Sequence, residues 1–174
     1  MKKFVDVFFL FLLGALIGWS YEVILHLIQD GTIVNRGMLH GPWLPIYGTG
    51  CILMVGLKKL TNGKPVAYFS SCFIASAVLE YATSWLMETI YHARWWDYSN
   101  LPLNLNGRIF LGGLFGFAAA GCLLVYVLLP MIEKGYRKIS YNIVQSTAGL
   151  LATFFILDVF ISVFFPNVGV GVTG

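Results

Sequence analysis

Residues 4–28 read FVDVFFLFLLGALIGWSYEVILHLI, an apolar stretch long enough to cross a membrane as one helix. Near its end, Trp19, Glu22 and His26 are spaced by three and four residues, so on an α-helix their side chains project from one face. A polar stripe inside lipid needs a polar partner. This triplet is therefore the starting point for a candidate site.

The same triplet returns later in the chain as Trp85, Glu88 and His92. After each triplet come an arginine-containing connection and a further apolar stretch. This order allows two helical hairpins in parallel orientation, a kind of repeat known among transporters whose site lies between the repeats.

The composition is that of an integral membrane protein. Hydrophobic residues make up 58% of the 174 residues and charged residues 11%, with a mean hydropathy of +0.78. Such a chain lacks the polar surface of a soluble domain. We expect a single all-α transmembrane domain over residues 1–174, with irregular or re-entrant outer loops. The expected bundle has five spans, at residues 4–28, 38–57, 65–90, 109–132 and 143–165.

The second expected span is interrupted in its first half. Pro42 and Pro45 remove backbone N–H donors, and Gly41, Gly48 and Gly50 lie beside them, so a clean helix is expected only near residues 49–57. The span is predicted to begin as a broken or re-entrant segment.

Basic residues divide between the two ends of the expected spans. Loops rich in Lys and Arg stay in the cytoplasm, which predicts a cytoplasmic N-terminus and an external C-terminus. The cytoplasmic set is Lys2, Lys3, Lys58, Lys59, Lys64, Lys134, Arg137 and Lys138, and the outer set is Arg36, Arg94 and Arg108.

Several function classes find no support in the sequence. A phosphate-binding loop, a nucleophile elbow and a zinc-protease motif are all missing, so the chain is not itself an ATPase and we lean against an enzyme. There is no basic stripe interleaved with aromatic residues for nucleic acid. His26, His40 and His92 could offer nitrogen ligands to zinc or iron, but Glu-to-His hydrogen bonding across one turn explains the spacing. We expect no metal and no cofactor.

Charged side chains gather near the predicted outer face. An ionised group within a span costs about 2.5–3.5 kcal/mol unless it faces protein or water, and arginines of the outer connections can pair with the carboxylates. We predict an outward-facing pocket for a polar or charged small solute. Its predicted lining is Glu22, Arg36, Glu80, Glu88, Arg94, Asp97, Asn104 and Arg108. A structural or secondary role is predicted for Trp19, Trp85, His26, His92 and Asp158.

One helix motif and two loop motifs point to a known family. They are Gly18-Trp19-x-x-Glu22, then Asn35-Arg36-Gly37-x-Leu39-x-Gly41-Pro42-x-x-Pro45-Ile46-Tyr47-Gly48, and then Trp95-Trp96-Asp97-Tyr98-Ser99 with Pro102, Asn104, Gly107, Arg108 and Ile109. Together they resemble the type IV ABC-transporter permease family of bacterial membrane proteins (CmpB-like), over roughly the first four spans. The resemblance implies a small permease-like protein of the bacterial cell membrane.

Three interpretations of the function stay open. The leading one is a transporter or transporter subunit, with Glu22 or Glu88 as the protonation site if transport is coupled to protons. The second is a membrane-embedded enzyme acting on a lipid-linked substrate, with Glu or His as general base and Arg holding phosphate. The third is an assembly partner whose charges serve only packing. Expected partners are membrane lipid, the solute, and either a separate ATP-binding subunit or further copies of this chain.

Overall fold

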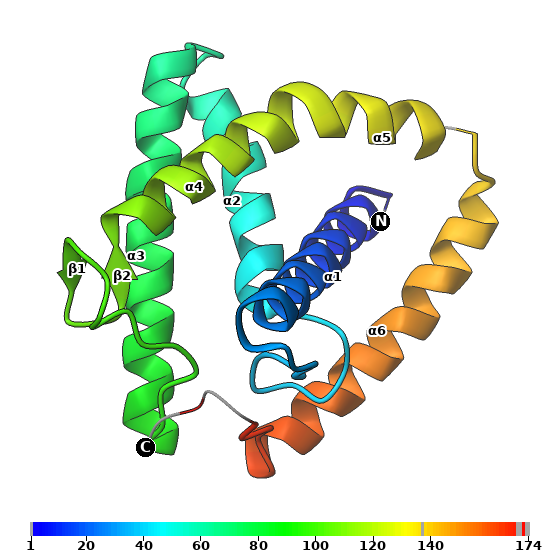
Figure 1. Cartoon of the computed structure of the whole chain (residues 1–174). Coiled ribbons are helices and arrows are strands. Elements are labelled where there is room, and N and C mark those ends of the chain that lie inside the picture. Colours follow the sequence, from blue (N-terminus) through cyan, green and yellow to red (C-terminus); the bar gives the residue numbers. More distant parts are fainter. Residues whose placement is uncertain (1, 137, 170–171, 173–174) are drawn as a thin grey trace. The chain divides into compact units, whose positions relative to one another are not determined.

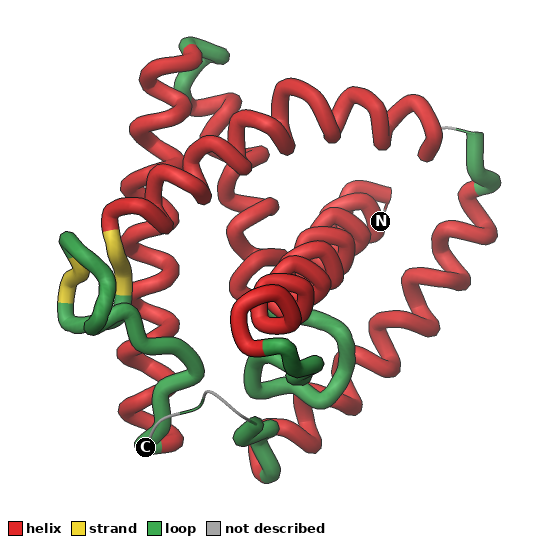
Figure 2. The backbone as a smooth tube through the Cα atoms, in the orientation of Figure 1, coloured by secondary structure: helices red, strands yellow, loops and turns green. Residues whose placement is uncertain are grey.

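The computed structural model describes residues 2–136, 138–169 and 172, and most of these are helical (Figures 1 and 2). A short antiparallel pair of strands places Asn104 opposite Phe110 and Leu105 opposite Ile109. The all-α class predicted from the sequence is confirmed. In chain order the elements are α1 (Lys2–Asp30), α2 (Pro45–Leu60), α3 (Pro65–Tyr91), β1 (Asn104–Leu105), β2 (Ile109–Phe110), α4 (Leu111–Leu123), the π-helical η1 (Leu124–Leu128), α5 (Leu129–Tyr136) and α6 (Tyr141–Phe164).

Within the described residues, four helices are long and apolar enough to cross a membrane. The chain is thus a multi-pass membrane protein. The five-span layout with two parallel repeats is not confirmed, because α2 has 16 residues, or about 24 Å of helix, which is short of a hydrocarbon core of about 30 Å. The four helices are Val5–Asp30, Pro65–Tyr91, Leu111–Tyr136 and Tyr141–Phe164.

Helix α2 begins later than the expected span at residues 38–57. Residues 31–44 are not helical, and the helix starts at Pro45. Proline suits the first turn of a helix, where its missing N–H is not needed, and its ring disfavours helical geometry in the residue before it.

The described chain packs as two compact units. Unit 1 holds residues 2–49, 134–136 and 138–169, and unit 2 holds residues 50–133 and 172. In unit 1, α1 packs on α6, where Val5 lies against Val144 and Ala148 and the rings of Phe11 and Phe155 meet edge to face at 5.4 Å. The first turn of α2 also belongs to unit 1.

The core of unit 2 lies where α3 meets α4. Tyr68, Cys72, Ala118 and Val125 are buried there. The Tyr68 hydroxyl lies 3.1 Å from the carbonyl of Gly121 and is within donating distance of the α2 backbone as well. A buried hydroxyl with such partners loses little on leaving water.

A proline explains the π-helical turn η1 between α4 and α5, which follow one another as a continuous helix in Figure 1. Pro130 has no N–H and its ring crowds the preceding turn. The N–H of Leu129 bonds to the carbonyl of Leu124, so it is drawn away from Val125, its partner in a regular α-helix. Lys58 of α2 compensates, because its Nζ lies 3.5 Å from the Val125 carbonyl and 5.2 Å from the centre of the Tyr126 ring.

Lys58→Met is expected to lower the free energy of unfolding by about 1 kcal/mol, since it removes a charged donor and a cation–π contact. In a Pro130→Ala background, where residue 130 again has an N–H, the same change should cost clearly less. Unfolding of the four proteins in detergent measures this difference. The exposed neighbour Lys59, changed to Met, is the control. Equal costs in both backgrounds would disprove the link between Lys58 and Pro130.

Gly48→Ala is expected to destabilise unit 1, because an added Cβ would lie 2.5 Å from the backbone carbonyl oxygen of Phe11. Such overpacking costs about 1–3 kcal/mol, and a chain of this size loses about 2–4 °C of Tm per kcal/mol. Gly56→Ala in the same helix is the matched control, because nothing lies within 4 Å of its Cβ position. Thermal melts in one detergent compare the two, and equal Tm values would refute the expected clash.

Candidate functional site

In unit 1 the connection after α1 folds back along that helix. The N–H of Leu44, just before α2, donates to the carbonyl of Ala15 at 3.0 Å. Ala15 lies 15 residues before the end of α1 at Asp30, which is about 22 Å along the helix axis. Residues 31–44 therefore return over about half the length of α1 before α2 begins.

The first triplet holds this connection through two of its three members. Glu22 accepts a hydrogen bond from the Tyr47 hydroxyl at 2.6 Å, and its other oxygen lies 3.5 Å from Nε of the buried Arg36. Trp19 donates its ring N–H to the side-chain oxygen of Asn35 at 2.6 Å. The carboxylate on α1 is thus paired with a guanidinium from the connection, which offsets its cost in a spanning helix.

Asp158 of α6, a later segment of unit 1, also binds the connection after α1. Its carboxylate accepts hydrogen bonds from the backbone N–H groups of His40 and Gly41 at 3.0 and 2.9 Å, from the ring N–H of Trp43 at 2.6 Å, and from the Ser162 hydroxyl at 3.2 Å. Four donors that carry no charge thus satisfy one carboxylate. This geometry suits the structural role predicted for Asp158.

In unit 2 the connection after α3 folds back in the same manner, and Figure 1 shows β1 and β2 beside the middle of α3. The Tyr98 hydroxyl donates to Glu80 at 3.1 Å, and the Asn106 amide donates to the Tyr81 hydroxyl at 2.9 Å. Glu80 lies 11 residues before the end of α3 at Tyr91, about 16 Å along the axis. Helix α4 therefore begins partway along α3.

Glu88 lies between two arginines of this connection. Nε of Arg94 donates to one carboxylate oxygen at 2.9 Å, and Arg108 donates to the other. Arg108 is only 9% exposed, and it also bonds to the Ser84 hydroxyl at 3.1 Å and lies over the Tyr81 ring. One carboxylate and two guanidinium groups leave one positive charge in excess within this triad.

Hydrogen bonds stabilise the ionised forms of Asp97 and Arg94. Asp97 accepts hydrogen bonds from the hydroxyl and the N–H of Ser99, and these bonds, with the charge of Arg94, lower the pKa of Asp97. The hydrogen bond to Glu88 raises the pKa of Arg94. Gly107, at φ +67°, lies against Asp97 and Ser99 so closely that any side chain there would collide with them.

The structure brings the predicted lining residues together in two sets. Glu22 and Arg36 pair in unit 1, whereas Glu88, Arg94 and Arg108 form the triad in unit 2. Asn104 donates to the carbonyls of Ser99 and Leu101, so it shapes the loop. A single pocket lined by both sets stays a prediction. Glu80, which bonds to Tyr98, and Asp97, which bonds to Ser99, complete the second set.

In both triplets the carboxylate pairs with arginine, but the tryptophan and the histidine have different surroundings. Trp85 is 54% exposed, unlike the hydrogen-bonded Trp19. His92 ends α3 in a left-handed conformation, with its N–H bonded to the carbonyl of Glu88, whereas Nδ1 of His26 lies 2.7 Å from the side chain of Asp30. Sequence reasoning missed Tyr47 and Tyr98, although both lie inside the quoted loop motifs.

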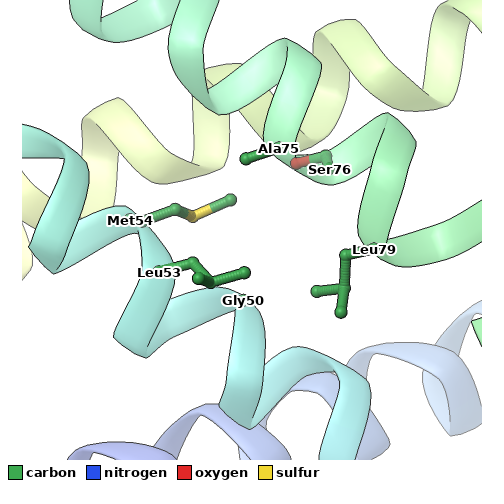
Figure 3. Close-up of a pocket in the computed structure, with 6 residues that line it drawn as sticks. All are labelled: Gly50, Leu53, Met54, Ala75, Ser76 and Leu79. Atoms are coloured by element: carbon green, nitrogen blue, oxygen red, sulfur yellow. The ribbon is translucent and has the colours of Figure 1, made fainter. Parts of the chain in front are cut away.

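No group of three or more His, Cys, Asp or Glu side chains that could hold a metal ion occurs in the described part of the chain. Unit 2 also contains a small recess between α2 and α3 (Figure 3). Ser76 is the one polar side chain among its lining residues, so it does not suit a charged solute. The lining residues are Gly50, Leu53, Met54, Ala75, Ser76 and Leu79.

Glu88→Gln is expected to destabilise the protein, because it leaves two guanidinium groups without their carboxylate. The double change Glu88→Gln with Arg108→Met should restore part of the loss, since it also removes the more buried cation. Chemical unfolding in detergent measures both proteins and the two single variants. Simple addition of the single costs would show that Glu88 and Arg108 do not act as a pair.

The comparison with known families covers the residues described above. Residues 9–163 match the model of the family described as "Putative ABC-transporter type IV", and this range includes both folded-back connections and all the residues of the two sets. Searches of the curated proteins and of the solved structures gave no match to this chain. The match confirms the resemblance carried by the helix and loop motifs. The chain, a multi-pass membrane protein, therefore belongs to the type IV family of ABC-transporter proteins.

Proposed function

We propose that this chain is a permease-like membrane subunit that binds a small solute bearing a carboxylate or phosphate group at the Glu88–Arg94–Arg108 triad. The observation that carries the proposal is one carboxylate held between two guanidinium groups at the end of a spanning helix. Arginine forks bind carboxylates and phosphates through paired hydrogen bonds. Charges in spanning segments are rare and usually mark solute paths.

Arg94 is the group of the triad best suited to meet a solute. Its side chain is 26% exposed, compared with 11% for Arg108. The buried Arg108 holds Glu88 and Ser84 in place, while Arg94 binds Glu88 through Nε and the Asn106 carbonyl through a terminal nitrogen. An incoming anion can replace the backbone carbonyl as the partner of Arg94 without breaking the buried pair.

The proposed placement is in the bacterial cell membrane, with the lysine-rich ends in the cytoplasm and the triad facing outward. In this arrangement residues 1–174 would form one transmembrane domain, with two parallel hairpins followed by α6. The pairing of Glu22 with Arg36 and of Glu88 with Arg94 and Arg108 supports this repeat. α2 would cross the membrane together with its folded-back connection. A separate ATP-binding subunit or a second copy would complete the transporter.

A thermal-shift screen of the purified protein in detergent tests the proposal with small carboxylates, inorganic phosphate, amines and neutral sugars. A ligand at 100 times its Kd stabilises the folded state by about 2.7 kcal/mol. We expect anions to raise Tm by several degrees, and Arg94→Ala to abolish the rise. Lys59→Ala is the control. It removes a positive charge from α2, at a position distant in sequence from Arg94, and should leave the rise in Tm unchanged.

Two outcomes would contradict this function. A rise in Tm with amines alone would mean that the site takes cations. If no solute shifts Tm and Arg94→Ala only lowers stability, the charges serve packing, and the chain is better described as an assembly partner.

A further inference from the structure

The loop that carries β1 presents an apolar face that the solute site does not use. Leu101, Leu103 and Leu105 are all exposed, Leu103 by 75% and Leu105 by 54%. They occupy every second position, with Pro102 and Asn104 between them, and all three side chains are exposed although only Asn104 and Leu105 are in a strand. Below, these three side chains are called the leucine face.

The side chains of Asn104 and Asn106 form hydrogen bonds within the protein. The side-chain amide of Asn104 donates to the carbonyls of Ser99 and Leu101 at 3.2 and 2.7 Å, and its oxygen accepts from the N–H of Gly107 at 3.0 Å. Asn106 bonds to Tyr81 of α3. These bonds satisfy part of the loop's own backbone and leave its leucines exposed, which suits an element at the boundary between headgroups and acyl chains.

The backbone holds Leu103 in this exposed position at a cost. Its φ is +54°, in the left-handed region that disfavours a residue with a Cβ by about 1–2 kcal/mol. A turn in water selects Gly, Asn or Asp for that geometry. The carbonyl of Leu103 accepts the N–H of Leu111 at 3.1 Å, which fixes the strained residue to the start of α4.

The depth of the loop along α3 indicates what covers the leucine face. Measured from Pro65, a hydrocarbon core of about 30 Å ends near Trp85, an exposed tryptophan of the kind enriched at membrane interfaces. Tyr81, which bonds to Asn106, lies one turn or about 6 Å below that level. Interfacial elements bury their apolar side chains about 5–10 Å into the boundary between headgroups and acyl chains.

We propose that the leucine face is a lipid contact, seated among the upper acyl chains of one leaflet, and that it fixes the loop bearing Arg94 and Arg108 at the membrane surface. Its partner is the bilayer itself. The inference does not depend on solute binding, because it rests on the exposed leucines, the hydrogen-bonded asparagines and the position of the loop on α3.

Photocrosslinking in lipid nanodiscs tests the lipid contact. The photoreactive residue p-benzoylphenylalanine is placed at Leu103, at Leu105 and, as the matched control, at the exposed polar Asn100 of the same loop. Mass spectrometry of the loop peptide then identifies the adducts. Each variant is used only if it keeps the Tm of the unmodified protein, which the exposure of these positions favours.

We expect lipid adducts at positions 103 and 105 and at least tenfold fewer at position 100. Equal yields at all three positions would overturn the proposal, since the leucine face would then be no nearer to lipid than Asn100. A crosslinked dimer in place of lipid adducts would also overturn it, and would assign the face to a second copy of this chain.

Discussion

The pairing of a carboxylate on a long helix with an arginine from the next connection is the constraint on which both units depend. Glu22 binds Arg36, and Glu88 binds Arg94 and Arg108. Because a charge inside a span must find its partner within the protein, each connection turns back toward the helix that it has just left. The helices that follow, α2 and α4, consequently begin partway along their neighbours.

Hydropathy and helix signals predict the long elements well. The first, third and last spans agree with α1, α3 and α6 to within a few residues at each end, because apolar length is a local property of the sequence. The late start of α2 follows from Pro45, but its alignment with Ala15 does not, because that contact joins distant parts of the chain.

The candidate site, too, could be predicted from the sequence only in part. Burial costs point to Glu22 and Glu88 as residues that need partners, and the predicted arginines are the ones that they bind. The partners Tyr47 and Tyr98 are not predictable from spacing, because each reaches its carboxylate only when a connection has folded back. The tryptophans mislead for a related reason: identical spacing places Trp19 against Asn35 but leaves Trp85 exposed, since the connections differ in length and sequence.

The bonds of Asp158 have a consequence for the order in which the protein is made. His40, Gly41 and Trp43 leave the ribosome more than a hundred residues before the carboxylate that binds them. Glu22 meets Arg36 early in synthesis, so the first connection can begin to fold at once. It acquires its bonds to Asp158 only after α6 has entered the membrane. Unit 1 is therefore completed by a helix that is synthesised after all of the helices of unit 2.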